Sequence, residues 1–305
     1  MRIVRELDSA PPDVRPSAVA LGTFDGVHLG HRAILGTALR RAREVGVEAV
    51  ACTFDPHPIE VLQPDRAPRP ITPFDERLAL IGETGVDAVV VLAFTRALAA
   101  VEPEAFVKDV LLDRLHAREI VVGYNHRFGR GARGDARLLE DLAGRLGFRA
   151  HVVPPMTVDG VAVSSTEIRA ALHRGDVRSA ARGLGRPYAI AGRVTTGAGR
   201  GRTLGFPTAN IAPDRPLLVA RGVYRGGVTV DAGQHAAVVN VGVRPTFGED
   251  TLAVEAHLLD FAGDLYGREV RLDFLDRLRD EMRFPSVEEL KAQVSRDIAA
   301  ARSRA

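Results

Sequence analysis

The first half of the chain alternates short apolar runs with longer segments of amphipathic pattern. The apolar runs predict five strands, at residues 18–21, 47–54, 88–93, 119–122 and 149–153. Apolar residues at helical spacing predict helices between the strands, at residues 34–42, 75–83, 104–115 and 136–146. Strands that alternate with helices form a parallel sheet covered on both faces, and such sheets bind ligands beyond the carboxyl ends of their strands. We therefore expect an α/β domain with its site at those ends.

The pattern changes near residue 185, after a helical connector over residues 172–185. Strand-like segments now follow one another without long helices, at residues 188–194, 222–230, 236–241, 252–259 and 268–274. Short strands joined by glycine turns predict an antiparallel barrel. A last amphipathic helix starts near Ser286, which fits a capping box with Glu289. The predicted domains are residues 1–185, an α/β domain, and residues 186–305, a β-barrel with a C-terminal helix.

One stretch, residues 22–31, joins the first predicted strand to the helical segment after it. Its glycines let the backbone turn tightly, and His28 and His31 stand where the helix begins. Helix N-termini attract phosphate, so imidazoles there are expected to contact a nucleotide and to stabilise charge in a transition state. The spacing also fits two turn histidines or two metal ligands. The residues of this stretch predicted to bind ATP are Gly22, Phe24, Asp25, His28, Gly30 and His31.

Two further loops follow predicted strands, and both fit ordinary turns when taken alone. Prolines stiffen the loop that holds Asp55 and His57. Asn125 lies after the fourth strand, where its amide can hydrogen-bond a planar heterocycle. These loops are candidates for the same site because both follow strands of the predicted parallel sheet.

Residues 164–169 open a predicted helix. Ser164 with Glu167 fits a capping box, which alone would explain Ser164. Ser165, Thr166 and Arg169 are also placed to bind triphosphate oxygens at a helix N-terminus.

The second half has one glycine-rich stretch, residues 192–210. Its candidate phosphate ligands are the backbone N–H groups around three glycines, Gly197, Gly199 and Gly201. Thr208 and Asn210 supply a hydroxyl and a carbonyl oxygen, which are hard ligands suited to Mg²⁺. The chain contains no P-loop lysine motif, so its phosphates are expected to be held by backbone N–H groups, His, Arg and a metal ion.

Composition narrows the class of protein. The 305 residues allow two domains, and an apolar fraction of 46% supports an ordinary core. No apolar run approaches the roughly 18–20 residues that cross a bilayer, and the first residues lack a secretory pattern. With Cys52 as the single cysteine, a cytoplasmic location is expected. The basic residues are dispersed, which gives no nucleic-acid-binding face.

Several motifs carry a resemblance to one family. The string GTFDGVHLGH resembles the bacterial bifunctional riboflavin kinase/FAD synthetase family and contains the His-x-Gly-His signature of adenylyl-transferring enzymes. Residues 164–169 resemble the Ser-Ser/Thr-Thr-x-Ile-Arg motif of the same superfamily. Residues 192–210, which end in Phe-Pro-Thr-Ala-Asn, resemble the riboflavin kinase signature. The resemblance covers nearly the whole chain, with the motifs in order.

The resemblance implies a Rossmann-like nucleotidyltransferase domain followed by a riboflavin kinase barrel, with Mg²⁺ and ATP as cosubstrate. The barrel would phosphorylate riboflavin to FMN, and the first domain would adenylylate FMN to FAD. Thr208 and Asn210 would bind Mg-ATP, and Glu255, after an Asn-Val-Gly turn at residues 240–242, would be the catalytic base. By pattern alone Glu255 is a surface strand carboxylate. Arg279 matches a late basic residue near the flavin. The flavin-binding residues so implied are Asp55, His57, Asn125 and Arg279.

One departure leaves an alternative open. Asn125 and His126 stand where the family more often has an acidic residue followed by an aromatic one. A chain with kinase activity alone would fit that departure. A non-enzymatic, flavin-sensing module that binds nucleic acid would need degraded catalytic positions and a clustered basic face, and the sequence has neither. The expected partners are riboflavin, FMN and ATP, without nucleic acid or membrane, and the oligomeric state is left open.

Overall fold

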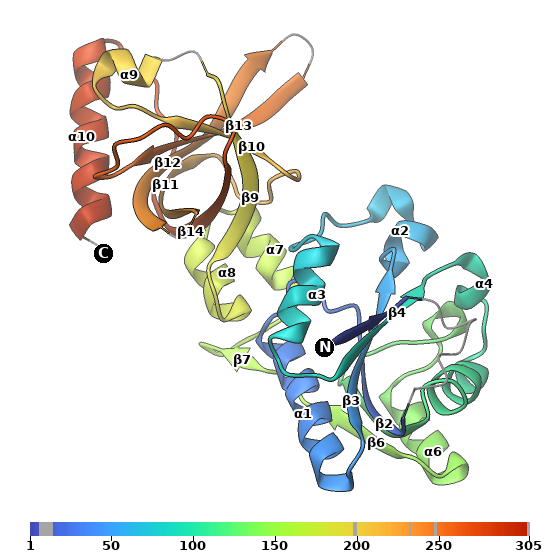
Figure 1. Cartoon of the computed structure of the whole chain (residues 1–305). Coiled ribbons are helices and arrows are strands. Elements are labelled where there is room, and N and C mark those ends of the chain that lie inside the picture. The colour runs from blue at the N-terminus through green and yellow to red at the C-terminus, as the bar shows by residue number, and fades with distance from the viewer. Residues whose placement is uncertain (6–14, 198–199, 232, 247–248, 304–305) are drawn as a thin grey trace. The chain divides into compact units, whose positions relative to one another are not determined.

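The computed structural model describes residues 1–5, 15–197, 200–231, 233–246 and 249–303 (Figure 1). It divides into two compact units, Met1–Ser165 and Thr166–Ala305. Among the described residues, no helix is long and apolar enough to cross a membrane.

The first unit is built on a six-stranded sheet whose paired strands all run parallel. Its strand order is β1-β4-β3-β2-β5-β6. The strands are β1 (Arg2–Val4), β2 (Ser17–Leu21), β3 (Glu48–Asp55), β4 (Ala88–Ala93), β5 (Ala117–Gly123) and β6 (Arg149–Val153). The chain winds outward from β2 in one direction and then resumes at β5 on its other side. The order therefore reverses between β2 and β5, and doubly wound sheets bind ligands at such a point.

Helices cover both faces of this sheet (Figure 1). The helices α1 (Leu29–Val45) and α3 (Phe74–Gly82) pack on one face, against small residues such as Ala18 and Ala20. The π-helical segment Phe106–Leu112 and α6 (Ala136–Leu146) pack on the other. Short elements complete the unit: α2 (Pro58–Leu62), α4 (Arg96–Ala99), α5 (Pro103–Ala105), the 3-10 turns Pro64–Arg66 and Arg130–Ala132, and the hairpin strands β7 (Thr157–Val158) and β8 (Val161–Ala162).

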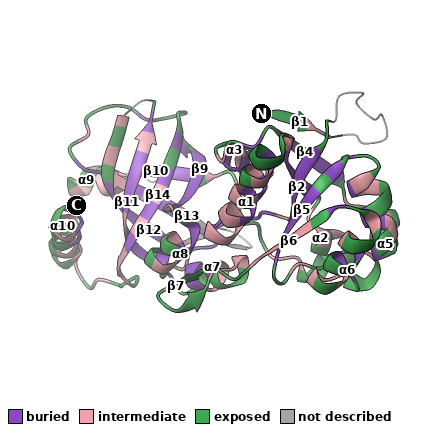
Figure 2. Cartoon of the chain, turned by 90° about the horizontal axis from the view of Figure 1, so that it is seen from below, coloured by how far each residue is buried: buried purple, intermediate pink, exposed green. Residues whose placement is uncertain are grey.

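The second unit is a closed antiparallel barrel with the strand order β10-β13-β12-β11-β14-β9. Its strands are β9 (Tyr188–Thr195), β10 (Ala209–Pro213), β11 (Gly222–Val230), β12 (Gly233–Thr246), β13 (Glu249–Leu258) and β14 (Glu269–Arg279). Alternate residues such as Val254 and Ala256 are fully buried. Much of the barrel strands is purple, the colour of buried residues, in Figure 2. The helix α9 (Arg200–Leu204) precedes β10, and α10 (Val287–Ser303) packs on the outside of the barrel (Figure 1).

Two connector helices belong to the second unit by their contacts. They are α7 (Ser165–His173) and α8 (Val177–Leu184). Arg178 of α8 forms a 2.9 Å ion pair with the buried Asp276 of β14, and the Leu172 carbonyl accepts a hydrogen bond from the Ala220 N–H. A functional boundary near residue 185 stays a prediction.

The predicted fold class is confirmed in both halves. The hydrophobic pattern missed β1, β10 and α9, and residues 240–242 lie inside β12 and are not a turn. The last helix begins where predicted, and the Ser286 hydroxyl accepts a hydrogen bond from the Glu289 N–H at 3.2 Å.

Candidate functional sites

The loop between β2 and α1 lies at the carboxyl edge of the sheet, where the strand order reverses. Its turn requires positive φ angles at Phe24 (53°), Gly26 (83°) and Val27 (39°). Side chains rarely adopt this conformation. Phe24 and Val27 are fully buried, so packing offsets the strain. The sequence therefore holds a defined loop here at a conformational cost.

The two histidines stack at the start of α1. Their ring centroids lie 3.6 Å apart at an interplanar angle of 17°. His28 is the N-cap residue, and its Nδ1 accepts a hydrogen bond from the His31 N–H at 3.2 Å. Gly30 makes room for this arrangement, because a Cβ there would lie 3.1 Å from the His28 ring. The pair is thus a built feature of the helix start.

Burial controls the charge of His31. Its pKa lies well below the ordinary value, first because the ring is desolvated and then because His28 and Arg77 are nearby positive groups. The ring is therefore neutral at pH 7. Its Nδ1 is buried and has no hydrogen-bond partner in the described part of the chain. A buried polar atom of this kind is suited to meet a ligand.

Arg77 is a candidate site residue that the sequence interpretation missed. It lies on the buried face of α3, is 6% exposed, and donates from Nη1 to the Thr23 carbonyl at 2.8 Å. Its guanidinium also lies over the Phe74 ring, 4.7 Å from the centroid. Desolvation lowers its pKa, and Asp25, Asp55 and Glu60 oppose that shift. The sequence feature that could have indicated Arg77 is its position among the apolar residues of a predicted helix.

Asp25, which was predicted to bind ATP, also holds a neighbouring segment of backbone. Its carboxylate, only 2% exposed, accepts hydrogen bonds from the N–H groups of Ile71 (2.9 Å) and Thr72 (3.3 Å). The Asp25 carbonyl accepts a hydrogen bond from the Ser165 hydroxyl at 3.0 Å. The first motif and the start of the second are therefore in contact.

The remaining predicted residues of the first half lie on different elements. Asp55 ends β3, and His57 caps α2 by accepting the Ile59 N–H at 3.2 Å. Asn125 lies in the exposed loop after β5, at the same edge of the sheet. Thr166 and Arg169 lie on α7 in the second unit. Their predicted role at the triphosphate stays a prediction.

His126 packs as an aromatic residue would. Its ring stacks on Phe128 with 6.0 Å between centroids, and burial lowers its pKa to about 4. The departure at residues 125–126 therefore keeps an aromatic packing position.

In the barrel, strand register gathers residues that are far apart in sequence. Directly paired positions link Thr195 to Asn210, Asn210 to Glu255, and Glu255 to Asn240. The row continues from Asn240 to Val223 of β11 and from Val223 to Arg279 of β14. Residues directly opposite each other point to the same face of a sheet. Predicted metal, base and flavin residues thus share one row, together with Asn240, which was not predicted.

A cavity of about 680 Å³ covers this row. Its lining includes Thr208, Asn210, Asn240, Glu255 and Arg279 from the row and its neighbourhood. Leu290 and Val294 of α10 and Phe284 of the preceding loop close another side. The cavity therefore combines oxygen ligands with apolar side chains.

The three glycines predicted to bind phosphate lie in different surroundings. A Cβ on Gly197 would lie 2.0 Å from the Asn210 Nδ2, so only glycine allows the Asn210 amide to approach. Gly201 is inside α9, where a Cβ would lie 3.0 Å from the Thr208 hydroxyl oxygen. Gly199 lies outside the described residues. The two described glycines thus shape the space around Thr208 and Asn210.

The donor set suits a hard cation. The Asn210 Oδ1 is buried and has no hydrogen-bond partner within the described ranges. His257, which was not predicted, holds the neighbouring segment, because its Nδ1 lies 2.8 Å from the Pro207 carbonyl. In the described part of the chain, no cluster of three or more His, Cys, Asp or Glu side chains could hold a metal. A hydroxyl and an amide oxygen that share Mg²⁺ with phosphate oxygens need no such cluster.

Comparisons with known proteins match each half of the chain to a family. A family model described as FAD synthetase matches residues 10–167, and one described as riboflavin kinase matches residues 184–305. A bifunctional riboflavin kinase/FMN adenylyltransferase of Pseudomonas fluorescens is 41% identical over 100% of this chain and 98% of its own length. The corresponding protein of Escherichia coli strain K12 is 38% identical over 99% of this chain and 96% of its own. The chain belongs to this bifunctional family.

Within this family the chain carries both an FAD synthetase domain and a riboflavin kinase domain. The Bacillus subtilis member is 36% identical over 92% of this chain and 90% of its own. A solved Streptococcus pneumoniae structure, described as a macrolide-efflux protein, matches with a TM-score of 0.89 at 29% identity, over 99% of both chains. The two-domain fold is therefore shared along its whole length.

Proposed function

We propose that the riboflavin kinase domain transfers the γ-phosphoryl group of ATP to the 5′-hydroxyl of riboflavin, giving FMN and ADP. The observation that carries the proposal is the row Asn210–Glu255–Asn240, on three neighbouring strands under one cavity. Phosphoryl transfer depends mainly on positioning and on charge stabilisation, with a base near the attacking hydroxyl. Glu255 accepts the proton of that hydroxyl.

The order of the row matches the order of the reacting groups. Asn210 is one strand from Glu255, about 5 Å away, while Arg279 is three strands away on the other side, about 14 Å along the barrel surface. The nucleotide phosphates belong at the Asn210 end and the flavin ring at the Arg279 end. The attacking hydroxyl then lies between them, beside Glu255.

Thr208 and Asn210 would hold Mg²⁺ through their side-chain oxygens. When bound there, the ion would neutralise charge on the phosphate oxygens. The buried, unpartnered Oδ1 of Asn210 supports this assignment. Gly197 and Gly201 keep the approach to both residues open.

We further propose that the FAD synthetase domain joins FMN to a second ATP. The FMN phosphate attacks the α-phosphorus, a P–O bond forms, and pyrophosphate leaves with the electrons of the broken P–O bond. No protein nucleophile is needed. Because His28 Nδ1 accepts the His31 N–H, the ring proton is on Nε2, and an N–H there is the kind of donor that a phosphate oxygen accepts. His28, His31 and Arg169 orient the triphosphate and stabilise the transition state.

Asp55, His57 and Asn125 are proposed flavin contacts at this edge of the sheet, and the chain is proposed to act in the cytoplasm without nucleic acid. Incubation of the protein with riboflavin, ATP and Mg²⁺, followed by separation of the flavins, tests the proposal. FMN and FAD are the expected products. FMN alone would leave only the kinase, and the absence of both products would contradict both activities.

A further inference from the structure

The C-terminal helix α10 closes one side of the kinase cavity and does so through a buried carboxylate. Leu290, Val294 and Asp297 of this helix line the cavity. Asp297 is 5% exposed. A buried charge is costly unless it is paired and hydrogen-bonded, so its partners indicate what it holds.

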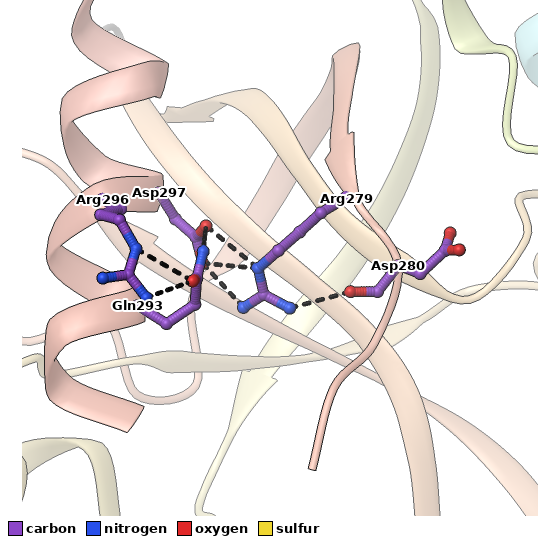
Figure 3. A network of polar contacts seen from close by, with 5 residues as sticks. All are labelled: Arg279, Asp280, Gln293, Arg296 and Asp297. Carbon is purple, nitrogen blue, oxygen red and sulfur yellow. Dashed lines mark hydrogen bonds and ion pairs between the residues drawn. The ribbon is translucent and has the colours of Figure 1, made fainter. Parts of the chain in front are cut away.

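Asp297 receives a fork of hydrogen bonds from Arg279 (Figure 3). Arg279 Nε lies 3.0 Å and 3.1 Å from its two oxygens, and Nη2 lies 2.7 Å from Oδ2. Gln293, one turn earlier on α10, donates from Nε2 to Oδ1 at 2.8 Å. Arg296 in turn donates to the Gln293 Oε1. Bidentate pairs of this kind fix geometry as well as contributing energy.

The same guanidinium also holds the loop between β14 and α10. Arg279 Nη1 donates to the Asp280 carbonyl at 2.8 Å, and its carbon lies 5.8 Å from the centroid of the Phe284 ring. Met282 and Phe284 of this loop line the cavity. One side chain therefore connects the end of β14, the loop and α10.

This junction lies at the end of the row where the proposed reaction needs the flavin ring. The lining includes the apolar side chains Val223, Val238, Leu290 and Val294, together with the pair Arg279 and Asp297. Such a lining suits a flat aromatic ligand, and its shape depends on how α10 and the loop are held.

We infer that Asp297 is a positioning residue for riboflavin. Its carboxylate fixes the Arg279 guanidinium and, through it, the loop and α10 as the wall of the flavin end of the cavity. Asp297 acts through Arg279 and takes no part in the proton or phosphoryl transfer. The inference rests on the proposed kinase activity of this cavity.

The test is Asp297→Asn in the full chain. The amide keeps the shape but loses the charge, and its NH₂ end faces an N–H donor of Arg279, so the fork is broken. We expect the KM for riboflavin to rise about tenfold, while kcat and the KM for ATP change less than about threefold. FAD synthesis from supplied FMN should be unchanged.

Asp260→Asn is the matched control. It removes another Asp–Arg pair of α10, Asp260 with Arg302 at 2.6 Å, which is exposed and away from the cavity lining. Its KM for riboflavin should equal that of the wild type. Arg279→Lys should reproduce the Asp297→Asn effect, and the double variant should be no worse than the poorer single one, since both act on one contact.

Equal riboflavin KM values for Asp297→Asn and Asp260→Asn would overturn the inference. So would an Asp297→Asn variant that only lowers the melting temperature, because that marks a purely structural role. If the wild type makes FMN and Asp297→Asn has the same riboflavin KM as the wild type, the inference is contradicted and the proposed kinase function is not. A wild type that makes no FMN contradicts the proposed kinase function itself.

Discussion

In the FAD synthetase domain the best-defined site residues come from one continuous stretch, residues 22–31, whereas the riboflavin kinase domain gathers its residues from several strands of a barrel. The first site depends on a strained turn and a helix start. The second depends on register, because a slip of one residue would turn Glu255 from the cavity to the barrel interior. The geometry of the first site therefore depends on the residues of one short stretch. The geometry of the second site depends on how whole strands pair.

The two sites also differ in their donors. The first contains the buried His31 imidazole, whose pKa is lowered because burial disfavours its charge. The second uses hydroxyl, amide and carboxylate oxygens around a buried, unpartnered Oδ1 of Asn210. Variants that remove one set should leave the other activity intact, and each prediction below tests that separation.

The largest effect is expected from the double substitution His28→Ala with His31→Ala. Each phosphate contact that strengthens in the transition state is worth about 2–4 kcal/mol, by analogy with oxyanion-hole donors. FAD synthesis from FMN should fall by several orders of magnitude while FMN production stays near that of the wild type. Rates of both steps, measured by flavin separation, check this. A folded double variant that makes FAD at full rate would show that the stretch is only structural.

Glu255→Gln should have the next largest effect. The amide keeps the size of the side chain but cannot accept a proton, and loss of a general base costs about 10²–10⁴ in rate. Riboflavin phosphorylation should fall by that factor, and adenylylation of supplied FMN should continue. Near-normal kinase turnover would exclude Glu255 as the base.

Gly197→Ala tests the space around Asn210. A Cβ there would collide with the Asn210 amide, and overpacking of this kind costs about 1–3 kcal/mol, so kinase activity should fall about tenfold with FAD synthesis unchanged. Gly227→Ala is the control, because its Cβ would meet the flexible end of Gln234 at 3.3 Å and the Leu275 Cδ1 at an ordinary contact distance of 4.0 Å. Equal effects of the two substitutions would contradict a special role for Gly197.

The smallest effect concerns stability. Because burial lowers the His126 pKa to about 4, the unfolded chain takes up the proton first as the pH falls below the ordinary value of 6.5. The free energy of unfolding should therefore decrease between pH 7 and pH 4. His126→Phe should remove about 1–2 kcal/mol of that decrease. The lowered pKa of His31 also makes the free energy of unfolding decrease as the pH falls.

Denaturant unfolding of the first unit at pH 7.5 and pH 4.5 measures this difference. An equal pH dependence in His126→Phe and the wild type would contradict the assignment.

The sequence predicted much of the fold because hydrophobic periodicity reports local structure. It located five of the six strands of the sheet, five of the six barrel strands and the last helix. It missed β10 because Ala209–Pro213 is short and ends in proline, and its pairing partners are distant in sequence. Strand pairing depends on tertiary contacts, which the sequence of a single segment does not specify.

The same limit explains what was missed at the sites. Thr208, Asn210 and Glu255 were predicted from motifs, but the row that joins Asn210 to Glu255, and Asn240 within it, follow only from register. Arg77 and Asp297 are charged residues on buried helix faces, and the sequence alone does not say which partner makes such burial stable.

The independence of the two sites can be measured by mixing the two inactive variants. The His28→Ala, His31→Ala variant should convert riboflavin to FMN only, and Glu255→Gln should make FAD only from supplied FMN. Together with riboflavin, ATP and Mg²⁺, they should make FAD after a lag in which FMN accumulates. FMN that accumulates without FAD, at a concentration that Glu255→Gln alone converts, would contradict two independent sites.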